Sequence, residues 1–262
     1  MEEKKLYISQ VRPGIYLMDE AHEATGYLVV GRDRACVIDT MNGYNDLYAA
    51  VRKLTDRPLV VVNTHGHPDH VFGNIYFDEA FMHPADGPLA REFAKEPEFV
   101  EFCREKGLSM PPFKDILPGD TIDLGGRTLV VYGLPGHTPG GILLLLKEER
   151  ILFTGDSVNH HLWMQLDGCL PLHEFVKALD KVMFLTGEAD ILLHGHARRE
   201  DDISLLPCMK RGIEEICAGK TEDDRPYEWF GGVDLQHAYS CDPNRRYQQD
   251  EHVICYRADN IE

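Results

Sequence analysis

Three histidines and an aspartate stand within six residues of the chain, and this cluster constrains the fold more than any other feature. The run Asn63-Thr64-His65-Gly66-His67-Pro68-Asp69-His70 directly follows an apolar stretch, 59–62, that is typical of a buried strand. Imidazoles held this close repel one another when protonated and lack partners when buried, whereas a divalent cation accepts all of them as neutral ligands. The run therefore predicts a metal site at a strand end.

Three further candidate ligands each lie just beyond a predicted strand. They are His137 in Pro-Gly-His-Thr-Pro-Gly, Asp156 in Thr-Gly-Asp, and His196 in His-Gly-His. Strand ends that meet at one edge of a sheet bring such side chains together. We expect four strand ends to meet at one rim.

These residues, in this order, resemble the metallo-β-lactamase superfamily. Its His-x-His-x-Asp-His motif is likewise followed by a histidine, a bridging aspartate and a last histidine, and the resemblance covers most of the chain. It implies an α/β fold of four layers, an αββα sandwich, with metals at one edge of two facing sheets. We expect a single domain over residues 1–262, with possible lid segments at 84–117 and 157–170 and a C-terminal extension at 220–262.

The resemblance also implies a role for each ligand-type residue. One metal would be held by His65, His67 and His137, the second by Asp69, His70 and His196, and Asp156 would bridge them. The sequence departs from the family at His194, where many relatives have proline. We expect His194 to pack beside the ligands or to support them from behind.

The resemblance implies two divalent ions, with zinc as the expected metal and iron or manganese also suited to these donors. Two such ions can share a hydroxide that attacks a small ester, lactone or thioester. Asp69 would orient the attacking water and carry a proton, which makes it the candidate catalytic residue. Asp39, Thr64 and Thr154 could hydrogen-bond the ligands, or could simply cap strand ends.

The loop after Asp156 is rich in large side chains and is expected to form a wall of the substrate pocket. His160, His161 and Trp163 lie in it, and Tyr239 in the tail is a further candidate for substrate contact. The alternative is that Trp163 belongs to the core and that both histidines are solvated.

Charge and hydropathy exclude other partners. With 44 acidic against 27 basic residues the net charge is −17, which opposes binding to nucleic acid or to an anionic membrane. No apolar run approaches the roughly 20 residues of a transmembrane helix, and residues 1–6 lack the apolar core of a secretory signal, so a cytoplasmic protein with a small-molecule substrate is expected. The oligomeric state stays open.

Seven scattered cysteines, none in a Cys-x-x-Cys pair, are expected to be reduced thiols.

Two other functions remain as alternatives. The same ligands would serve an oxidoreductase with a single iron that resembles persulfide dioxygenases, or a phosphodiesterase for small molecules. A dedicated glutathione thioesterase is less favoured, because Arg245 and Arg246 are the only adjacent basic residues in a tail that otherwise looks like strand.

Overall fold

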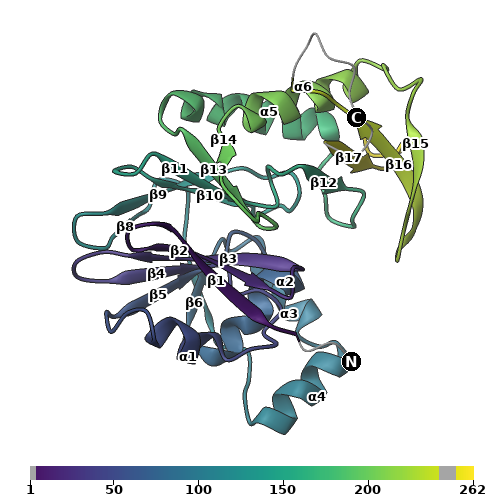
Figure 1. Cartoon of the computed structure of the whole chain (residues 1–262). Coiled ribbons are helices and arrows are strands. Elements are labelled where there is room, and N and C mark those ends of the chain that lie inside the picture. Colours follow the sequence, from purple (N-terminus) through teal and green to yellow (C-terminus); the bar gives the residue numbers. More distant parts are fainter. Residues whose placement is uncertain (1–3, 242–251) are drawn as a thin grey trace.

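The computed structural model describes residues 4–241 and 252–262. Two β-sheets face each other across a shared apolar layer, and helices cover the outer face of each sheet (Figure 1). The αββα sandwich expected from the sequence is therefore confirmed. Arg245 and Arg246 lie outside the described residues.

The first sheet is built by the N-terminal half of the chain. Its first four strands are antiparallel, and from the fourth strand onward neighbouring strands are parallel. In spatial order the strands are β1 (Leu6–Arg12), β2 (Ile15–Glu20), β3 (Ala24–Val30), β4 (Ala35–Ile38), β5 (Leu59–Val62), β6 (Ala80–Met82) and β7 (Phe113–Asp115). The intervening helices are α1 (Leu47–Arg52), α2 (Pro68–Val71), the 3-10 helix η1 (Phe72–Tyr76), α3 (Gly87–Phe93) and α4 (Pro97–Lys106).

The second sheet is built by the C-terminal half. Its strands, in spatial order, are β14 (Asp201–Asp202), β13 (Ile191–His194), β11 (Ile151–Gly155), β10 (Ile142–Leu146), β9 (Thr128–Gly133) and β8 (Thr121–Asp123). Its outer face is covered by α5 (Leu172–Val182) and α6 (Leu205–Cys217), and the 3-10 helix η2 (Met183–Gly187) follows α5 (Figure 1).

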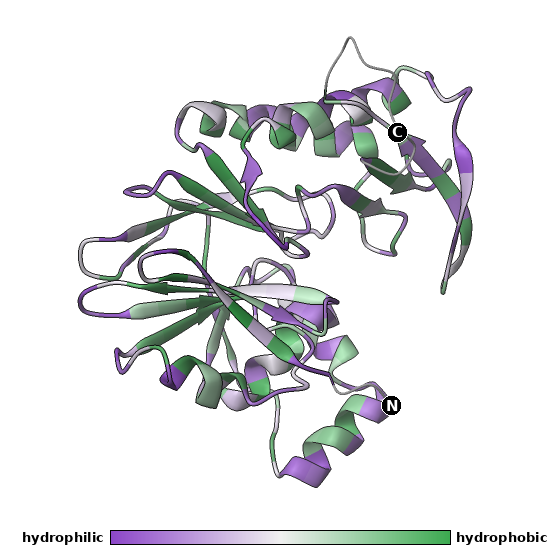
Figure 2. Cartoon of the chain, in the orientation of Figure 1, coloured by the Kyte–Doolittle hydropathy of each residue, from purple (hydrophilic) through white to green (hydrophobic). Residues whose placement is uncertain are grey.

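Strand β10 shows why the sandwich needs four layers. All five of its residues are buried, because successive side chains of a strand point to opposite faces. Leu144 and Leu146 join the layer between the sheets, whereas Leu143 and Leu145 pack in the cluster that includes α5 and α6. A strand that is apolar on both faces is stable only when both faces are covered. Figure 2 shows the same pattern, with hydrophobic residues gathered in the strands of both sheets.

A third sheet lies at one end of the sandwich and includes three strands of the tail. Its order is β12 (His161–Met164), β17 (Val253–Tyr256), β16 (Gly232–Ala238) and β15 (Arg225–Trp229). The hairpin β15–β16 projects beside the sandwich (Figure 1). Segments 157–170 and 220–262, which looked separate in the sequence, thus share one sheet through the pairing of β12 with β17.

Cys208 of α6 and Cys241 form a disulfide, so the expectation that all seven cysteines are reduced is wrong for this pair. The two positions are 33 residues apart. Their pairing depends on β16 returning along α6, a contact between distant segments that cysteine spacing cannot reveal. Among the residues that the structure describes, no helix is long and apolar enough to cross a membrane.

Candidate metal centre

The candidate ligands meet at one edge of the two sheets. Residues 63–70 follow β5 and lead into α2, Asp156 follows β11, and His196 follows β13. Because β11 and β13 are parallel neighbours, their carboxyl ends place Asp156 and His196 side by side. His137 comes from the connection between β9 and β10. The rim of strand ends expected from the sequence is present.

Three imidazoles form the first group of donors. One nitrogen each of His65, His67 and His137 lies within 4.8 Å of the other two. His67 Nδ1 is 2.9 Å from His137 Nε2, and all three side chains are buried. A single ion can be held between three nitrogens that converge in this way.

Four side chains form the second group: Asp69, His70, Asp156 and His196. Asp156 also reaches the first group. Its Oδ2 is 3.0 Å from His196 Nε2 and 3.9 Å from His137 Nε2, while its Oδ1 is 3.5 Å from His70 Nε2. One carboxylate therefore lies between the two groups of donors.

The residues at this edge fit divalent metal ions. His65 Nε2, His70 Nε2 and Asp156 Oδ1 are buried and have no hydrogen-bond partner among the described residues, although a buried polar atom without one costs about 1–3 kcal/mol. The absence of a side chain at position 195 also leaves room for these donors. A Cβ on Gly195 would lie 2.3 Å from Asp156 Oδ1 and 2.4 Å from His70 Cε1. Imidazole nitrogens and carboxylate oxygens are suitable donors for zinc, iron and manganese.

The pKa values of the histidines shift in opposite directions in the two groups of donors. Burial and the neighbouring imidazoles hold the pKa of His65 and of His67 well below the ordinary value, so both are neutral, as a ligand must be. Burial also lowers the pKa of His70, but three carboxylates outweigh it and raise that pKa well above the ordinary value; they belong to Asp69, Asp156 and Asp39. The second group therefore attracts positive charge.

Asp39 links two of the ligands behind the site. Its Oδ2 accepts hydrogen bonds from His70 Nδ1 at 2.9 Å and from Thr64 Oγ1 at 2.7 Å, and its Oδ1 accepts from the Thr64 amide at 2.7 Å. Thr64 Oγ1 also lies 3.0 Å from His65 Nδ1. These contacts occupy the Nδ1 atoms, so the Nε2 atoms of His65 and His70 are left to face the site.

Backbone carbonyls orient the other two imidazoles that present Nε2. His137 Nδ1 donates to the carbonyl oxygen of Trp163 at 2.6 Å, and His196 Nδ1 donates to that of Glu23 at 2.7 Å. His194 supports His196 from behind, because its Nδ1 accepts the His196 amide at 3.1 Å. With Nδ1 accepting, the proton of neutral His194 resides on Nε2.

Two candidate residues contact no ligand and line neither cavity, and for Thr154 the alternative that it caps a strand end holds. Thr154 Oγ1 donates to the Val158 carbonyl at 2.8 Å and so shapes the turn after β11 instead of contacting a ligand. Tyr239 is only 2% exposed and packs in the core against α6, and it lines neither of the cavities described below. Its predicted substrate contact is therefore not supported.

Asp86, which no sequence pattern predicted, links the two segments that carry the ligands. Its buried carboxylate accepts hydrogen bonds from the Gly66 amide at 3.0 Å, Thr138 Oγ1 at 2.7 Å and the Gly140 amide at 2.6 Å. Gly66 belongs to the His65–His70 segment, and Thr138 and Gly140 both follow His137 in the chain. Nothing in the local sequence around Asp86 signals this role.

A cavity of about 660 Å³ opens beside the metal centre. It is lined by five of the seven candidate ligands, by His161 and by four aromatic rings. The rings are those of Phe93, Trp163, Tyr227 and Phe230, of which only Trp163 was a sequence candidate. Trp163 contacts both Tyr227 and Phe230, with ring centroids 6.1 and 5.8 Å apart. Hairpin β15–β16 thus brings two of these rings to the cavity.

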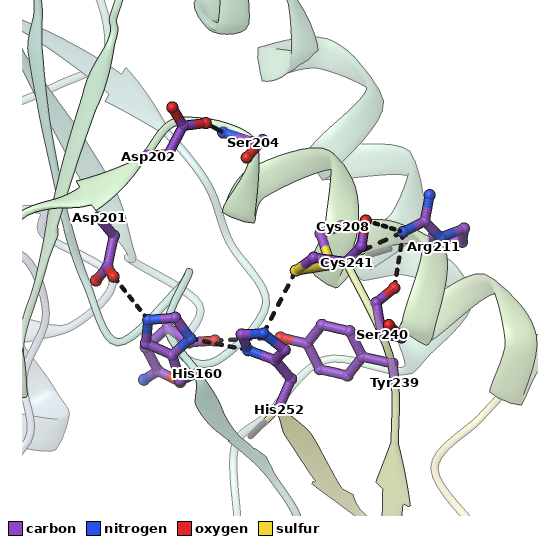
Figure 3. Close-up of a disulfide and its surroundings, with 11 residues drawn as sticks. His160, Asp201, Asp202, Ser204, Cys208, Arg211, Tyr239, Ser240, Cys241 and His252 are labelled. Carbon is purple, nitrogen blue, oxygen red and sulfur yellow. Dashed lines mark hydrogen bonds and ion pairs between the residues drawn. A yellow bond between two sulfur atoms is a disulfide. The ribbon is translucent and has the colours of Figure 1, made fainter. Parts of the chain in front are cut away.

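A second cavity, of about 500 Å³, adjoins the first, because His161 and His196 line both. His160 lines it and is held by two partners: its Nε2 is 2.9 Å from Asp201 Oδ1, and its Nδ1 is 2.8 Å from His252 Nδ1 (Figure 3). His160 is therefore anchored, and the alternative that it is simply solvated does not hold.

His160, His194 and Asp201 bring three donor atoms together, yet their hydrogen bonds oppose a third metal site. His194 Nε2 carries a proton and lies 3.3 Å from Asp201 Oδ2, to which it donates. Asp201 is thus partnered by two imidazoles, and they hold the pKa of its carboxyl far below the usual range although burial raises it.

Residues 22–219 match the family model described as the metallo-beta-lactamase superfamily. Acyl-coenzyme A thioesterase MBLAC2 from Gallus gallus is 29% identical over 216 residues, which cover 70% of this chain and 77% of that protein. Its Homo sapiens counterpart is 32% identical over 55% of this chain and 63% of its own length. Hydroxyacylglutathione hydrolase from Hyphomonas neptunium is 37% identical over 51% of this chain and 47% of its own.

Solved structures show the same fold at lower identity. The DIM-1 metallo-beta-lactamase superposes with a TM-score of 0.63 at 18% identity, over 82% of this chain and 100% of that one. A metallo-beta-lactamase family protein from Thermus thermophilus gives 0.60 at 21% identity, over 82% and 85%.

Proposed function

The chain belongs to the metallo-beta-lactamase superfamily, and from that membership we propose that it is a dinuclear metal-dependent hydrolase whose substrates are small thioesters. The finer parts of this proposal are the number of metal ions and the bond that is cleaved. The first rests on the position of Asp156, and the second on the lining of the larger cavity and on the relatives.

The position of Asp156 carries the proposal of two metal ions. Its carboxylate approaches His137 from the first donor group and both His70 and His196 from the second. A carboxylate between two sets of donors would help to hold an ion in each set. Zinc is the expected metal for this mixture of imidazole and carboxylate ligands.

Divalent ions bound here would lower the pKa of a water molecule and polarise a substrate carbonyl. The chain's own residues would then position the reactants. Asp69 lines the larger cavity, is partly exposed, and its Oδ2 lies 3.5 Å from His70 Nε2, so it can orient the attacking water and pass a proton to the leaving group. His161 faces both cavities and can donate a hydrogen bond to a substrate oxygen.

The larger cavity favours a thioester with an apolar acyl group. Its four aromatic rings surround space next to the candidate metal centre, where an acyl chain or ring would be removed from water. The curated relatives named above are an acyl-coenzyme A thioesterase and a hydroxyacylglutathione hydrolase, and both names denote cleavage of a thioester. Esters and lactones have the same reacting carbonyl and are the comparison substrates.

The test combines metal content with turnover. Elemental mass spectrometry on protein purified without chelator should find about two divalent ions per chain, and a panel of thioesters, esters and lactones should show thioesters turned over fastest. Asp156→Asn should reduce both metal content and turnover, whereas Asp123→Asn, an exposed carboxylate on the far strand β8, should change neither. One iron per chain with no thioester turnover would contradict the proposal and would favour the iron-dependent oxidoreductase.

A further inference from the structure

Two cavities adjoin the candidate metal centre, share His161 and His196, and differ in the rest of their linings. No lysine or arginine is among the described residues that line the larger cavity, and two acidic residues outside the ligand set, Glu96 and Asp167, line it together with the aromatic rings. The smaller cavity contains two adjacent arginines, Arg198 and Arg199, beside four imidazoles and one carboxylate, that of Asp201. A substrate that occupies both cavities therefore meets aromatic rings in the larger one and two guanidinium groups in the smaller one.

The two arginines follow the last candidate ligand directly. His196 is separated from Arg198 by a single alanine, so the turn after β13 that presents the imidazole also places both guanidinium groups at the cavity. Both arginines are exposed, and Arg198 makes a long hydrogen bond of 3.5 Å to the His22 carbonyl.

Neither arginine has a carboxylate partner within residues 4–241 and 252–262, although the chain carries a net charge of −17. The nearby acidic groups are already engaged. Glu200 pairs with Arg12, with Oε2 2.8 Å from Nη2, and Asp201 is held by His160 and by His194. In a chain with such an excess of acid, two adjacent arginines that have no counter-ion among the described residues indicate a site for an external anion.

The larger cavity offers less to that anion. No lysine or arginine lines it among the described residues, and Asp167 in its lining is exposed and already paired, with its Oδ1 3.1 Å from Arg257 Nη1. Its aromatic rings suit the uncharged acyl group instead. The two linings thus orient a substrate with its acyl group toward the rings and its leaving group toward the arginines.

We propose that Arg198 and Arg199 form an anion-binding site for the leaving thiol, so that the enzyme prefers thioesters whose thiol carries a carboxylate or a phosphate. This inference rests on the proposed thioesterase function. Hydrolysis adds water across the acyl–sulfur bond and releases a carboxylic acid and the free thiol, and the arginines hold the thiol half in both substrate and product.

The test uses one acyl group on three thiols with the metal-loaded enzyme. Phenylacetyl thioesters of coenzyme A, of glutathione and of neutral N-acetylcysteamine separate phosphate, carboxylate and no charge. We expect KM to be about tenfold lower for at least one anionic thioester than for the neutral one. Arg198→Ala with Arg199→Ala should remove that difference without changing KM for the neutral thioester, whereas Arg32→Ala, an exposed arginine in the β3–β4 turn, should change none of the three.

A binding measurement separates this inference from the proposed function. Desulfo-coenzyme A and S-methylglutathione cannot be hydrolysed, and calorimetry on metal-free protein should show that the preferred one binds about tenfold more weakly to the double arginine variant. Raising the NaCl concentration from about 50 to about 300 mM should weaken this binding in the wild type. If the analogue binds in this way but no thioester is hydrolysed, the thioesterase proposal is wrong and the anion site stands.

Other results would overturn the anion site itself. Equal KM for charged and neutral thiols in the wild type would contradict it and leave the hydrolase proposal intact. The same conclusion would follow if the arginine variants instead lost turnover of succinyl-N-acetylcysteamine, in which the charge is on the acyl group.

Discussion

Replacing Gly195 by alanine should disrupt the second donor group while leaving the fold in place. Gly195 lies between the candidate ligand His196 and His194, and its backbone is held at both ends. Its amide donates to the Gly155 carbonyl at 2.9 Å, and its carbonyl accepts from the Thr25 amide at 2.7 Å. Because the backbone is fixed, a new methyl group must displace the neighbouring side chains.

The size of that displacement follows from the structure. A Cβ at position 195 would be 2.4 Å from His70 Cε1 and 2.3 Å from Asp156 Oδ1, whereas ordinary contacts begin at 3.4 Å. Both ligands must therefore retreat by about 1 Å, although metal–ligand distances tolerate deviations of only about 0.2 Å. We expect the affinity of the second site to fall about 100-fold or more. Crowding in the packed interior should cost about 1–3 kcal/mol of unfolding free energy.

Metal affinity can be measured by competition with a chromophoric chelator, and the unfolding free energy by urea titration of the metal-free protein. Gly187→Ala is the matched control, because a Cβ at position 187 would meet no atom within 4 Å. Gly195→Ala should lose about one ion per chain and most of its activity, while Gly187→Ala should keep both. If Gly195→Ala binds two ions with wild-type affinity, the placement of His70 and Asp156 at a shared site is wrong.

Three further predictions test the proposed catalytic residue, the aromatic rings that line the larger cavity, and the disulfide. Asp69→Asn should lower kcat about 100-fold or more because proton transfer is impaired, and should change the unfolding free energy by less than about 0.5 kcal/mol; an unchanged kcat at full metal content would exclude that role. Phe230 is 88% exposed at the tip of the β15–β16 hairpin, so Phe230→Ala should raise KM about threefold to tenfold for a phenylacetyl thioester and hardly at all for an acetyl one, with no loss of stability. Cys208→Ser, which opens the link to Cys241 across 33 residues, should lower the unfolding free energy by about 3–4 kcal/mol in urea titration. Cys217→Ser is its control, and equal midpoints for the two variants would mean that the bridge contributes nothing.

Features with a local signature could be predicted from the chain. The apolar stretch 59–62 was recognised as a buried strand, and the structure has β5 at these residues, because burial imposes a run of apolar residues that a short window displays. The candidate ligands were found for the same reason: they follow strands directly, so a short sequence window contains both the strand and the ligand. His65, His137, Asp156 and His196 were all identified in this way, and the structure brings them together.

Features that depend on contacts between distant segments could not be predicted. Three of the aromatic rings that line the larger cavity come from β12 and the hairpin β15–β16. The sequence of neither segment shows which of its faces the other will cover. Tyr239 looked like a substrate contact but is a core residue, because the chain after β16 passes α6 at Gly212, where the absent side chain leaves room for the tyrosine ring. Hydropathy alone does not show whether an amphipathic side chain such as that of tyrosine packs in the core or faces a substrate.

The sequence by itself thus determined the chemistry of the site and the order of its ligands, because donor type is a property of each residue and strand ends are set by local pattern. Only the tertiary structure decided what surrounds them. It placed the Asp86 carboxylate between the two ligand loops, paired Cys208 with Cys241, and opened a cavity that holds Arg198 and Arg199 without counter-ions from the described part of the chain. Those relations depend on how the layers stack in space, and the energy of a charge or a thiol depends on neighbours that the chain brings from far away.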